Sequence, residues 1–195
     1  MSADAAENCC AGRRRLLEGL AGIAVCASLP LPVSAGTTPA KLPPQAGDLL
    51  ATPSWDDNPR VISPADVKLN AAPLMVFPQD AASGVTREKS RLNQILLVRL
   101  DPKTLDAATT ALAADGIVAY AGTCTHTGCG VTEWNGKTLH LVCPCHLSEF
   151  DPASAAARVT GPAPRPLPAL PLKIENGKLL VAGGFAARVG GAKPA

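Results

Sequence analysis

The sequence contains few aromatic residues, few charged residues and no run of one charge sign longer than three residues. Phe, Trp and Tyr together make up 3% of the 195 residues, charged residues make up 17%, and the formal net charge is +2. Without a basic run or an aromatic stacking pattern, nothing supports nucleic-acid binding. The sequence also lacks a paired acid/base motif, a nucleophile triad and a phosphate-binding loop. We therefore expect no substrate chemistry from this chain alone, and whether it forms part of an enzyme stays open.

Proline and glycine are abundant instead, with 19 and 17 residues. This composition fits a loop-rich β structure better than a helical bundle. The length allows one domain with a sizeable core and is too short for two large domains. Seven cysteines are unusual in a cytosolic chain unless metal or redox chemistry uses them.

Two short loops hold four of the seven cysteines and two of the three histidines. Their sequences are Cys-Thr-His-Thr-Gly-Cys at 124–129 and Cys-Pro-Cys-His-Leu-Ser at 143–148. Each loop offers a Cys and a His at close spacing, and together they supply two thiolates and two imidazoles, which suits a pair of sulfide-bridged irons. The cysteine left over in each loop could join the loops by a disulfide. A zinc site is an alternative that the Cys-x-His spacing fits badly, and purely structural cysteines are another.

The two motifs resemble the signature of high-potential Rieske [2Fe–2S] proteins, as in quinol-oxidising cytochrome bc complexes and the small subunit of arsenite oxidase. The resemblance implies that a [2Fe–2S] cluster is bound by one Cys and one His of each loop: Cys124, His126, Cys143 and His146. The thiolates would bind the inner iron, and the imidazoles the outer, more exposed iron. The resemblance also implies a stabilising disulfide between Cys129 and Cys145.

Two neighbouring residues are expected to tune the cluster. Ser148 stands where the family's serine donates its hydroxyl to a bridging sulfide. Phe150 stands where quinol-oxidising relatives carry a Tyr that bonds a ligand-cysteine sulfur, and Phe cannot donate that bond. We predict a positive reduction potential below that of those relatives. Thr127, where they often have Leu, and Leu147, which replaces a usual Gly, are further departures.

Short apolar runs bounded by proline or by turn residues predict strands. They lie at 73–77, 94–100, 117–120, 131–134, 138–142, 172–175 and 178–181. Consecutive apolar residues within 94–100 indicate burial on both faces. Two Asn-Gly pairs, at 135–136 and 176–177, predict hairpins, the first with a type I′ turn. His140 lies in an alternating pattern and is interpreted as an ordinary strand residue.

The resemblance implies an all-β Rieske fold, in which an antiparallel base domain carries an inserted cluster-binding subdomain. We expect the domain at 71–185 and its subdomain at about 123–162. The Gly-Pro-Ala-Pro stretch from Gly161 is similar to the loop that covers the cluster in this family, and prolines make such a loop stiff. A tail over 186–195 is expected to be peripheral or to contact a partner.

The proline-rich residues 36–70 predict an extended arm or linker. Trp55 within it either anchors an interface or packs on its own domain.

Residues 1–35 are typical of a targeting segment. Three arginines precede an apolar, uncharged run and then a group of small residues, as in a twin-arginine (Tat) signal peptide. Export of the folded chain suits a cofactor that is inserted first, so we expect a periplasmic protein. A retained inner-membrane anchor over 16–31 is the alternative, although the run is shorter than the ~20 residues of a usual spanning helix. The cysteines at 9, 10 and 26 have no assigned role.

Three functional classes follow from the resemblance, all of them one-electron transfer through the cluster. The first is the small subunit of an exported oxidoreductase similar to arsenite oxidase, taking electrons from a larger subunit, such as a molybdenum enzyme, towards a cytochrome. The second is the Rieske subunit of a quinol–cytochrome c reductase. The third is a cytoplasmic ferredoxin or oxygenase component, which the Tat-like segment and the additional cysteine pair oppose. The missing Tyr, the short domain and the weak anchor favour the first.

Overall fold

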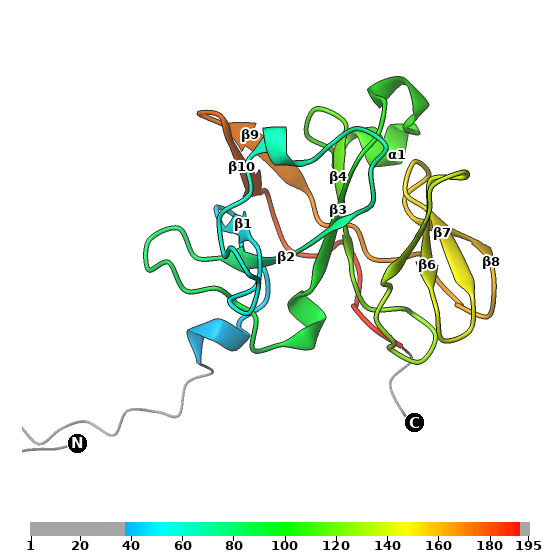
Figure 1. Ribbon diagram of the computed structural model, residues 1–195, viewed down its shortest axis with the longest axis horizontal. Coiled ribbons are helices and arrows are strands. Elements are labelled where there is room, and N and C mark those ends of the chain that lie inside the picture. The colour runs from blue at the N-terminus through cyan, green and yellow to red at the C-terminus, as the bar shows by residue number, and fades with distance from the viewer. Residues whose placement is uncertain (1–37, 192–195) are drawn as a thin grey trace, which may run out of the picture. The chain divides into compact units, whose positions relative to one another are not determined.

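The computed structural model describes residues 38–191, which form two antiparallel sheets with very little helix (Figure 1). The base sheet has the strand order β4-β3-β2-β1-β10-β9, and the second sheet the order β5-β6-β7-β8. The base strands are β1 (Leu49–Ala51), β2 (Leu74–Gln79), β3 (Ile95–Arg99), β4 (Ile117–Ala121), β9 (Leu172–Glu175) and β10 (Lys178–Val181). The second sheet consists of β5 (Glu133–Asn135), β6 (His140–Cys143), β7 (Ser148–Asp151) and β8 (Ala157–Thr160). This arrangement confirms the all-β prediction.

Helix within the described residues is limited to single turns. The α-helix α1 spans Ala107–Thr110, and the 3-10 turns span Pro39–Lys41, Pro64–Asp66, Arg91–Asn93 and Pro102–Thr104. Between residues 38 and 191 we find no helix with the length and apolar composition needed to cross a membrane. The expected signal or anchor over 1–35 lies outside the described residues.

Strand β3 separates two hydrophobic cores, because successive side chains of a strand point to opposite faces. Ile95 and Leu97 enter a core formed within the base domain. Leu96 and Val98 enter a second core, to which the second sheet and both cysteine loops contribute. The predicted burial of this run on both faces is therefore correct, and it attaches the small sheet firmly to the base.

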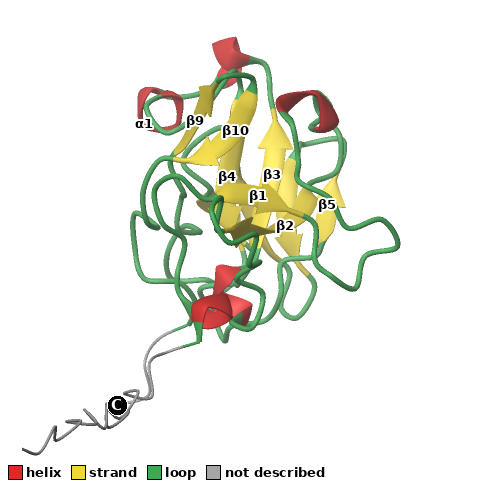
Figure 2. Ribbon diagram, turned by 90° about the vertical axis from the view of Figure 1, so that its left-hand side faces the viewer, coloured by secondary structure: helices red, strands yellow, loops and turns green. Residues whose placement is uncertain are grey.

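The described part of the proline-rich stretch belongs to the base domain. Strand β1 within it pairs with both β2 and β10, and the base strands lie next to one another in Figure 2. Asp48 accepts hydrogen bonds from Arg87 Nε at 2.8 Å and from Nη2 at 3.0 Å. Because both side chains are almost fully buried, each requires the other's charge. The structure thus differs from an extended arm over these residues.

Trp55, in the same stretch, contacts its own domain. Its ring packs edge-on against Phe77 with 5.6 Å between centroids, and 62% of the residue remains exposed. Of the two interpretations of Trp55, the structure supports packing on the domain, with one face left open.

The two Asn-Gly pairs form different turns. Asn176 and Gly177 both take positive φ, and the flanking residues of β9 and β10 pair directly, so this is a two-residue turn. The hairpin at Asn135 is also present, but Asn135 itself pairs with His140, so the loop between the two strands has four residues. Asn135 Oδ1 accepts the backbone N–H of Lys137 instead. The predicted type I′ turn at 135–136 is therefore wrong, because the asparagine side chain stabilises a longer turn.

Candidate metal centre

The first cysteine loop leaves β4 and folds back on itself. The N–H of Cys124 donates to the carbonyl of Cys129 at 2.8 Å, and the N–H of Gly128 donates to the carbonyl of Cys124 at 3.1 Å. Gly128 takes a φ of +82°, which glycine adopts without strain. Thr125 is fully buried, and its hydroxyl donates to the carbonyl of Arg165 at 2.6 Å. The loop therefore buries the Cys124 thiol and leaves His126 at the surface.

The second loop is the turn between β6 and β7. Cys143, the last residue of β6, pairs in register with Ser148, the first residue of β7, and both are buried. Between them the chain turns outward and places His146 at the exposed tip. Leu147 has a φ of +53° and is 65% exposed.

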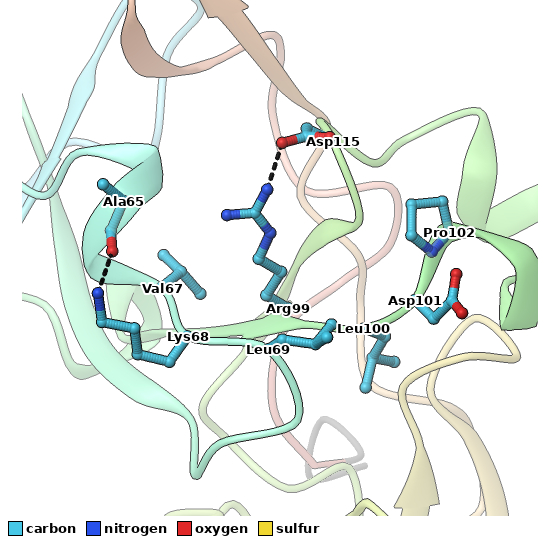
Figure 3. A pocket seen from close by; sticks show the side chains of 9 residues that line it. All are labelled: Ala65, Val67, Lys68, Leu69, Arg99, Leu100, Asp101, Pro102 and Asp115. Carbon is cyan, nitrogen blue, oxygen red and sulfur yellow. Dashed lines mark hydrogen bonds and ion pairs between the residues drawn. The ribbon is translucent and has the colours of Figure 1, made fainter.

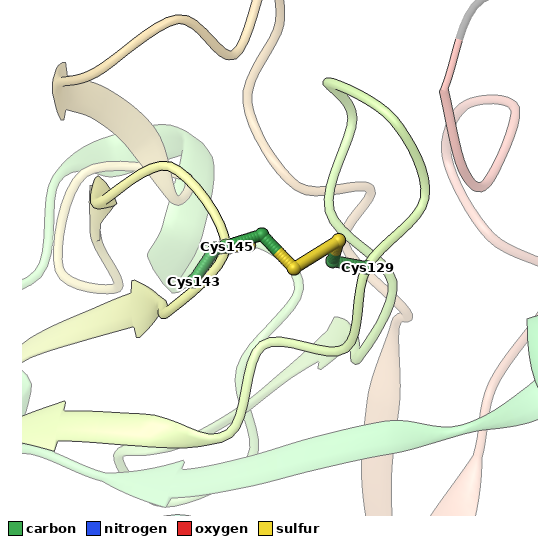
Figure 4. Close-up of side chains that lie close together, drawn as sticks. All are labelled: Cys129, Cys143 and Cys145. Atoms are coloured by element: carbon green, nitrogen blue, oxygen red, sulfur yellow. A yellow bond between two sulfur atoms is a disulfide. The ribbon is translucent and has the colours of Figure 1, made fainter.

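A disulfide between Cys129 and Cys145 joins the two loops (Figure 4). It is the bond that the resemblance implied. The sulfurs of Cys129, Cys143 and Cys145 lie within 4.8 Å of one another. Because two of these sulfurs are bonded to each other, only Cys143 of this group can supply a thiolate.

The two other cysteines of these loops lie side by side in the second core. Cys124 and Cys143 are both free and buried. Burial, and to a lesser extent the neighbouring Cys143, raises the pKa of the Cys124 thiol to about 11. A buried Cys124 thiolate is therefore unfavourable without a compensating cation, and a bound metal would supply that charge as it displaces the proton.

The two imidazoles face each other across the tip. The Nδ1 atoms of His126 and His146 are 3.2 Å apart, and the rings are nearly perpendicular. A tetrahedral metal with bonds of about 2.0–2.1 Å to nitrogen holds two ligand atoms roughly 3.4 Å apart. The described residues thus offer a buried sulfur pair and an exposed nitrogen pair on loops joined by a disulfide, and they fit a two-metal cluster with mixed ligands.

The proline-rich loop covers the second cysteine loop at Ser148. The N–H of Ala163 donates to Ser148 Oγ at 3.1 Å, so the hydroxyl proton remains available to donate. Gly161, with a φ of +86°, allows this contact, because a Cβ at that position would lie 2.4 Å from Ser148 Cα. Phe150 is fully buried in the core that also contains Cys124 and Cys143, and it brings no hydroxyl to that core.

Other candidate groups lie outside this arrangement. His140 Nδ1 is 3.1 Å from Oε2 of Glu149 on the adjacent strand β7, as an ordinary strand residue would be. A surface pocket at the end of β3 contains Arg99, paired with Asp115, and Lys68, which donates to the Ala65 carbonyl (Figure 3). Arg99 is thus ion-paired, and Lys68 is hydrogen-bonded to a backbone carbonyl. The cysteines at 9, 10 and 26 lie outside the described residues.

Two features near the site were not recognised from the sequence. The carbonyl of Arg165 accepts a hydrogen bond from the first loop, and its guanidinium donates one to the last described residues of the chain. Those residues, near Gly191, contact the backbone of His126. No motif spacing marks either contact, because each joins segments far apart in the sequence.

Comparison with known proteins agrees with this geometry. The family model described as a Rieske [2Fe-2S] domain matches residues 63–171. The chain therefore belongs to the Rieske family, and its cofactor is a [2Fe–2S] cluster.

Individual relatives match over part of their length. The cytochrome bc1 complex Rieske iron-sulfur subunit of Streptomyces lividans is 38% identical over 98 residues, which are 49% of this chain and 58% of that protein. A Rieske subunit named for a respiratory nitrate reductase in Haloferax mediterranei is 44% identical over 86 residues, 44% of this chain and 38% of that one. The chain thus spans less than two thirds of these relatives. Among solved structures, the soluble domain of Rieske protein II from Sulfolobus acidocaldarius aligns with a TM-score of 0.37 and 23% identity, covering 49% of this chain and 66% of that chain.

Proposed function

We propose that the cluster is held by Cys124, His126, Cys143 and His146, with the thiolates on the buried iron and the imidazoles on the exposed iron. The observation that carries this assignment is the separation of the two ligand types. The free thiols are buried together, and the Nδ1 atoms of the two histidines face each other at the surface.

The bound cluster would supply reversible one-electron transfer, at a potential between about −150 and +300 mV for this ligation. The chain's own residues exclude water from the sulfur side and leave the imidazole side open to an electron partner. Ser148, whose hydroxyl proton is free, would donate a hydrogen bond to the cluster. Phe150 would not, and it therefore keeps the potential lower than a Tyr would.

The assignment of the four ligands is tested on purified, anaerobically handled protein. We expect two irons per chain and, after reduction, an electron paramagnetic resonance (EPR) signal whose average g-value is that of mixed nitrogen and sulfur ligation. Cys124→Ser and His146→Ala should each abolish that signal, whereas His140→Ala should retain it, because His140 pairs with Glu149. Protein without iron, or with a spectrum of all-sulfur ligation, would contradict the assignment.

For the complex, we infer the Rieske subunit of a quinol–cytochrome c reductase of the bc1 type. The support is the similarity to cytochrome bc1 Rieske subunits such as that of Streptomyces lividans. A second candidate is the small subunit of another exported oxidoreductase, the class that the sequence analysis favoured with arsenite oxidase as its example. The similarity to the Haloferax mediterranei subunit and the presence of Phe150 support this second candidate. The relatives give more weight to the first.

A deletion strain separates the two candidates. If the first is correct, membranes of the strain lose quinol:cytochrome c reductase activity, and the wild-type gene restores it while the His146→Ala gene does not. If this activity is unchanged, the first candidate is wrong. Loss of a different periplasmic oxidoreductase activity would then support the second.

The proposed partners are a larger oxidoreductase subunit, a cytochrome, or both. We propose a periplasmic location reached through the Tat route, with membrane association through residues 16–31 if the segment is retained. Cell fractionation of a strain without the Tat translocase tests the route, because the protein should then stay in the cytoplasm.

A further inference from the structure

The last described residues lie against the first cysteine loop. After β10 the chain runs back across the base, where the N–H of Ala186 donates to the carbonyl of Ala169 at 2.8 Å. In Figure 1 this red segment ends beside the yellow-green loop that follows β4. Gly190 is buried, and a Cβ on it would lie 3.8 Å from Thr123 Cγ2. Residues 188–191, called here the C-terminal strap, are therefore packed on the protein rather than peripheral.

Arg165 connects the strap to the loop. Its Nη2 donates to the carbonyl of Gly190 at 2.8 Å, and its Nη1 donates to the carbonyl of Arg188 at 3.1 Å. Its own carbonyl accepts the hydroxyl of Thr125 at 2.6 Å. Thr125 is fully buried and immediately precedes His126. One residue of the proline-rich loop thus bonds both the strap and the loop that carries His126.

The strap also approaches the backbone of His126 directly. A Cβ on Gly191 would lie 2.6 Å from the carbonyl oxygen of His126 and 3.4 Å from the nitrogen of Gly128. Both are backbone atoms, so neither can rotate away. The contrast is Gly184 in the same C-terminal segment, where an added Cβ would meet no atom within 4 Å.

We infer that the C-terminal strap borders the cluster site together with the two cysteine loops, and that Arg165 is a positioning residue. Its bonds to the strap set the orientation of His126. The inference rests on the proposed role of His126 as a ligand. The physical reason is that an exposed loop ligand keeps its direction only if its backbone is held, and for His126 the strap and Arg165 hold it. Contacts behind metal ligands commonly change metal retention by about 10-fold to 100-fold when they are removed.

The test compares two alanine variants of the full-length, cluster-loaded protein. Gly191→Ala should shift the EPR g-values of the reduced cluster and speed the loss of its visible absorbance by about tenfold. Gly184→Ala, the matched control, should retain the wild-type spectrum and rate. If the two variants behave alike in both measurements, the inference is overturned.

Substitutions at Arg165 provide an independent test should Gly191→Ala fail to fold. Arg165→Met removes both bonds to the strap while its backbone carbonyl can still accept from Thr125, so it should reproduce the shifted g-values. Arg165→Lys keeps the charge but cannot bond two carbonyls with a planar fork. Its g-values should therefore lie between those of the wild type and those of the Met variant. Wild-type g-values in the Lys variant, or in the Met variant, would contradict the inference. The proposed function fails separately if the wild-type protein lacks the mixed-ligand spectrum.

Discussion

The two cysteine loops carry the same types of candidate ligand but are supported differently. The first loop is held by segments distant in sequence, through the bond from Thr125 to Arg165 and the contact of Gly191 with His126. The second is a turn between paired neighbours, Cys143 and Ser148, and its tip is exposed. The geometry of the second loop is thus largely local, whereas that of the first depends on the whole domain.

The disulfide is the bond that the two loops share, so its removal should have one of the two largest effects on stability. The bonded cysteines are 16 residues apart, and a closed loop of this length stabilises a protein by about 3 kcal/mol. Cys129→Ser combined with Cys145→Ser should lower the free energy of unfolding by about that amount, measured by denaturant titration. Addition of a reductant should destabilise the wild type and leave the variant unchanged. An unchanged midpoint in the variant would show that the loops hold together without the bond.

Gly161→Ala tests the cover over the second loop. The new Cβ would overlap Ser148 Cα, and the residue has a positive φ. We expect a loss of about 3 kcal/mol, of which about 1 comes from the backbone conformation and the rest from the overlap. Gly177→Ala is the matched control, because Gly177 also has a positive φ but nothing within 4 Å, so only about 1 kcal/mol should be lost there. Equal losses, measured by thermal or denaturant unfolding, would argue against close packing at Ser148.

Phe150→Tyr should raise the reduction potential of the cluster. Phe150 shares a core with the candidate ligands Cys124 and Cys143, and a hydroxyl there could donate to a ligand sulfur. A net hydrogen bond of about 1 kcal/mol corresponds to ~40 mV for a one-electron couple. Voltammetry measures the shift, and Phe150→Leu, which adds no donor, should show no rise. If the Tyr variant shows none either, the missing hydroxyl does not set the potential.

Leu147→Gly should have the smallest effect and should stabilise the protein. Leu147 has a positive φ at an exposed tip, and glycine adopts this conformation without the steric penalty. After the entropy cost of glycine we expect a gain of about 0.5 kcal/mol in the free energy of unfolding. The control is Val159→Gly, at an exposed position of β8, where glycine should destabilise. Destabilisation at both positions would show that Leu147 packs on the second loop.

Much of the fold could be predicted because apolar runs and turn residues act on neighbours in the sequence. The apolar runs of β2, β3, β4, β9 and β10 appear where expected, and the consecutive apolar residues of β3 correctly indicated burial on both faces. The two Asn-Gly hairpins show the limit of such signals. The pair at 176–177 forms a tight turn, whereas Asn135 uses its side chain to stabilise a longer one.

Family, fold class and cofactor could be predicted from the amino-acid pattern because cluster binding needs Cys and His at fixed short spacings. The identity of the four ligands stays a prediction that the arrangement of thiols and imidazoles supports. The positions of the proline-rich stretch and of the C-terminal strap became evident only in the folded chain. Arg87 bonds Asp48 across 39 residues, and Arg165 bonds Gly190 across 25. Such long-range partners leave no periodic or compositional pattern, because the bonds arise only when distant segments fold together.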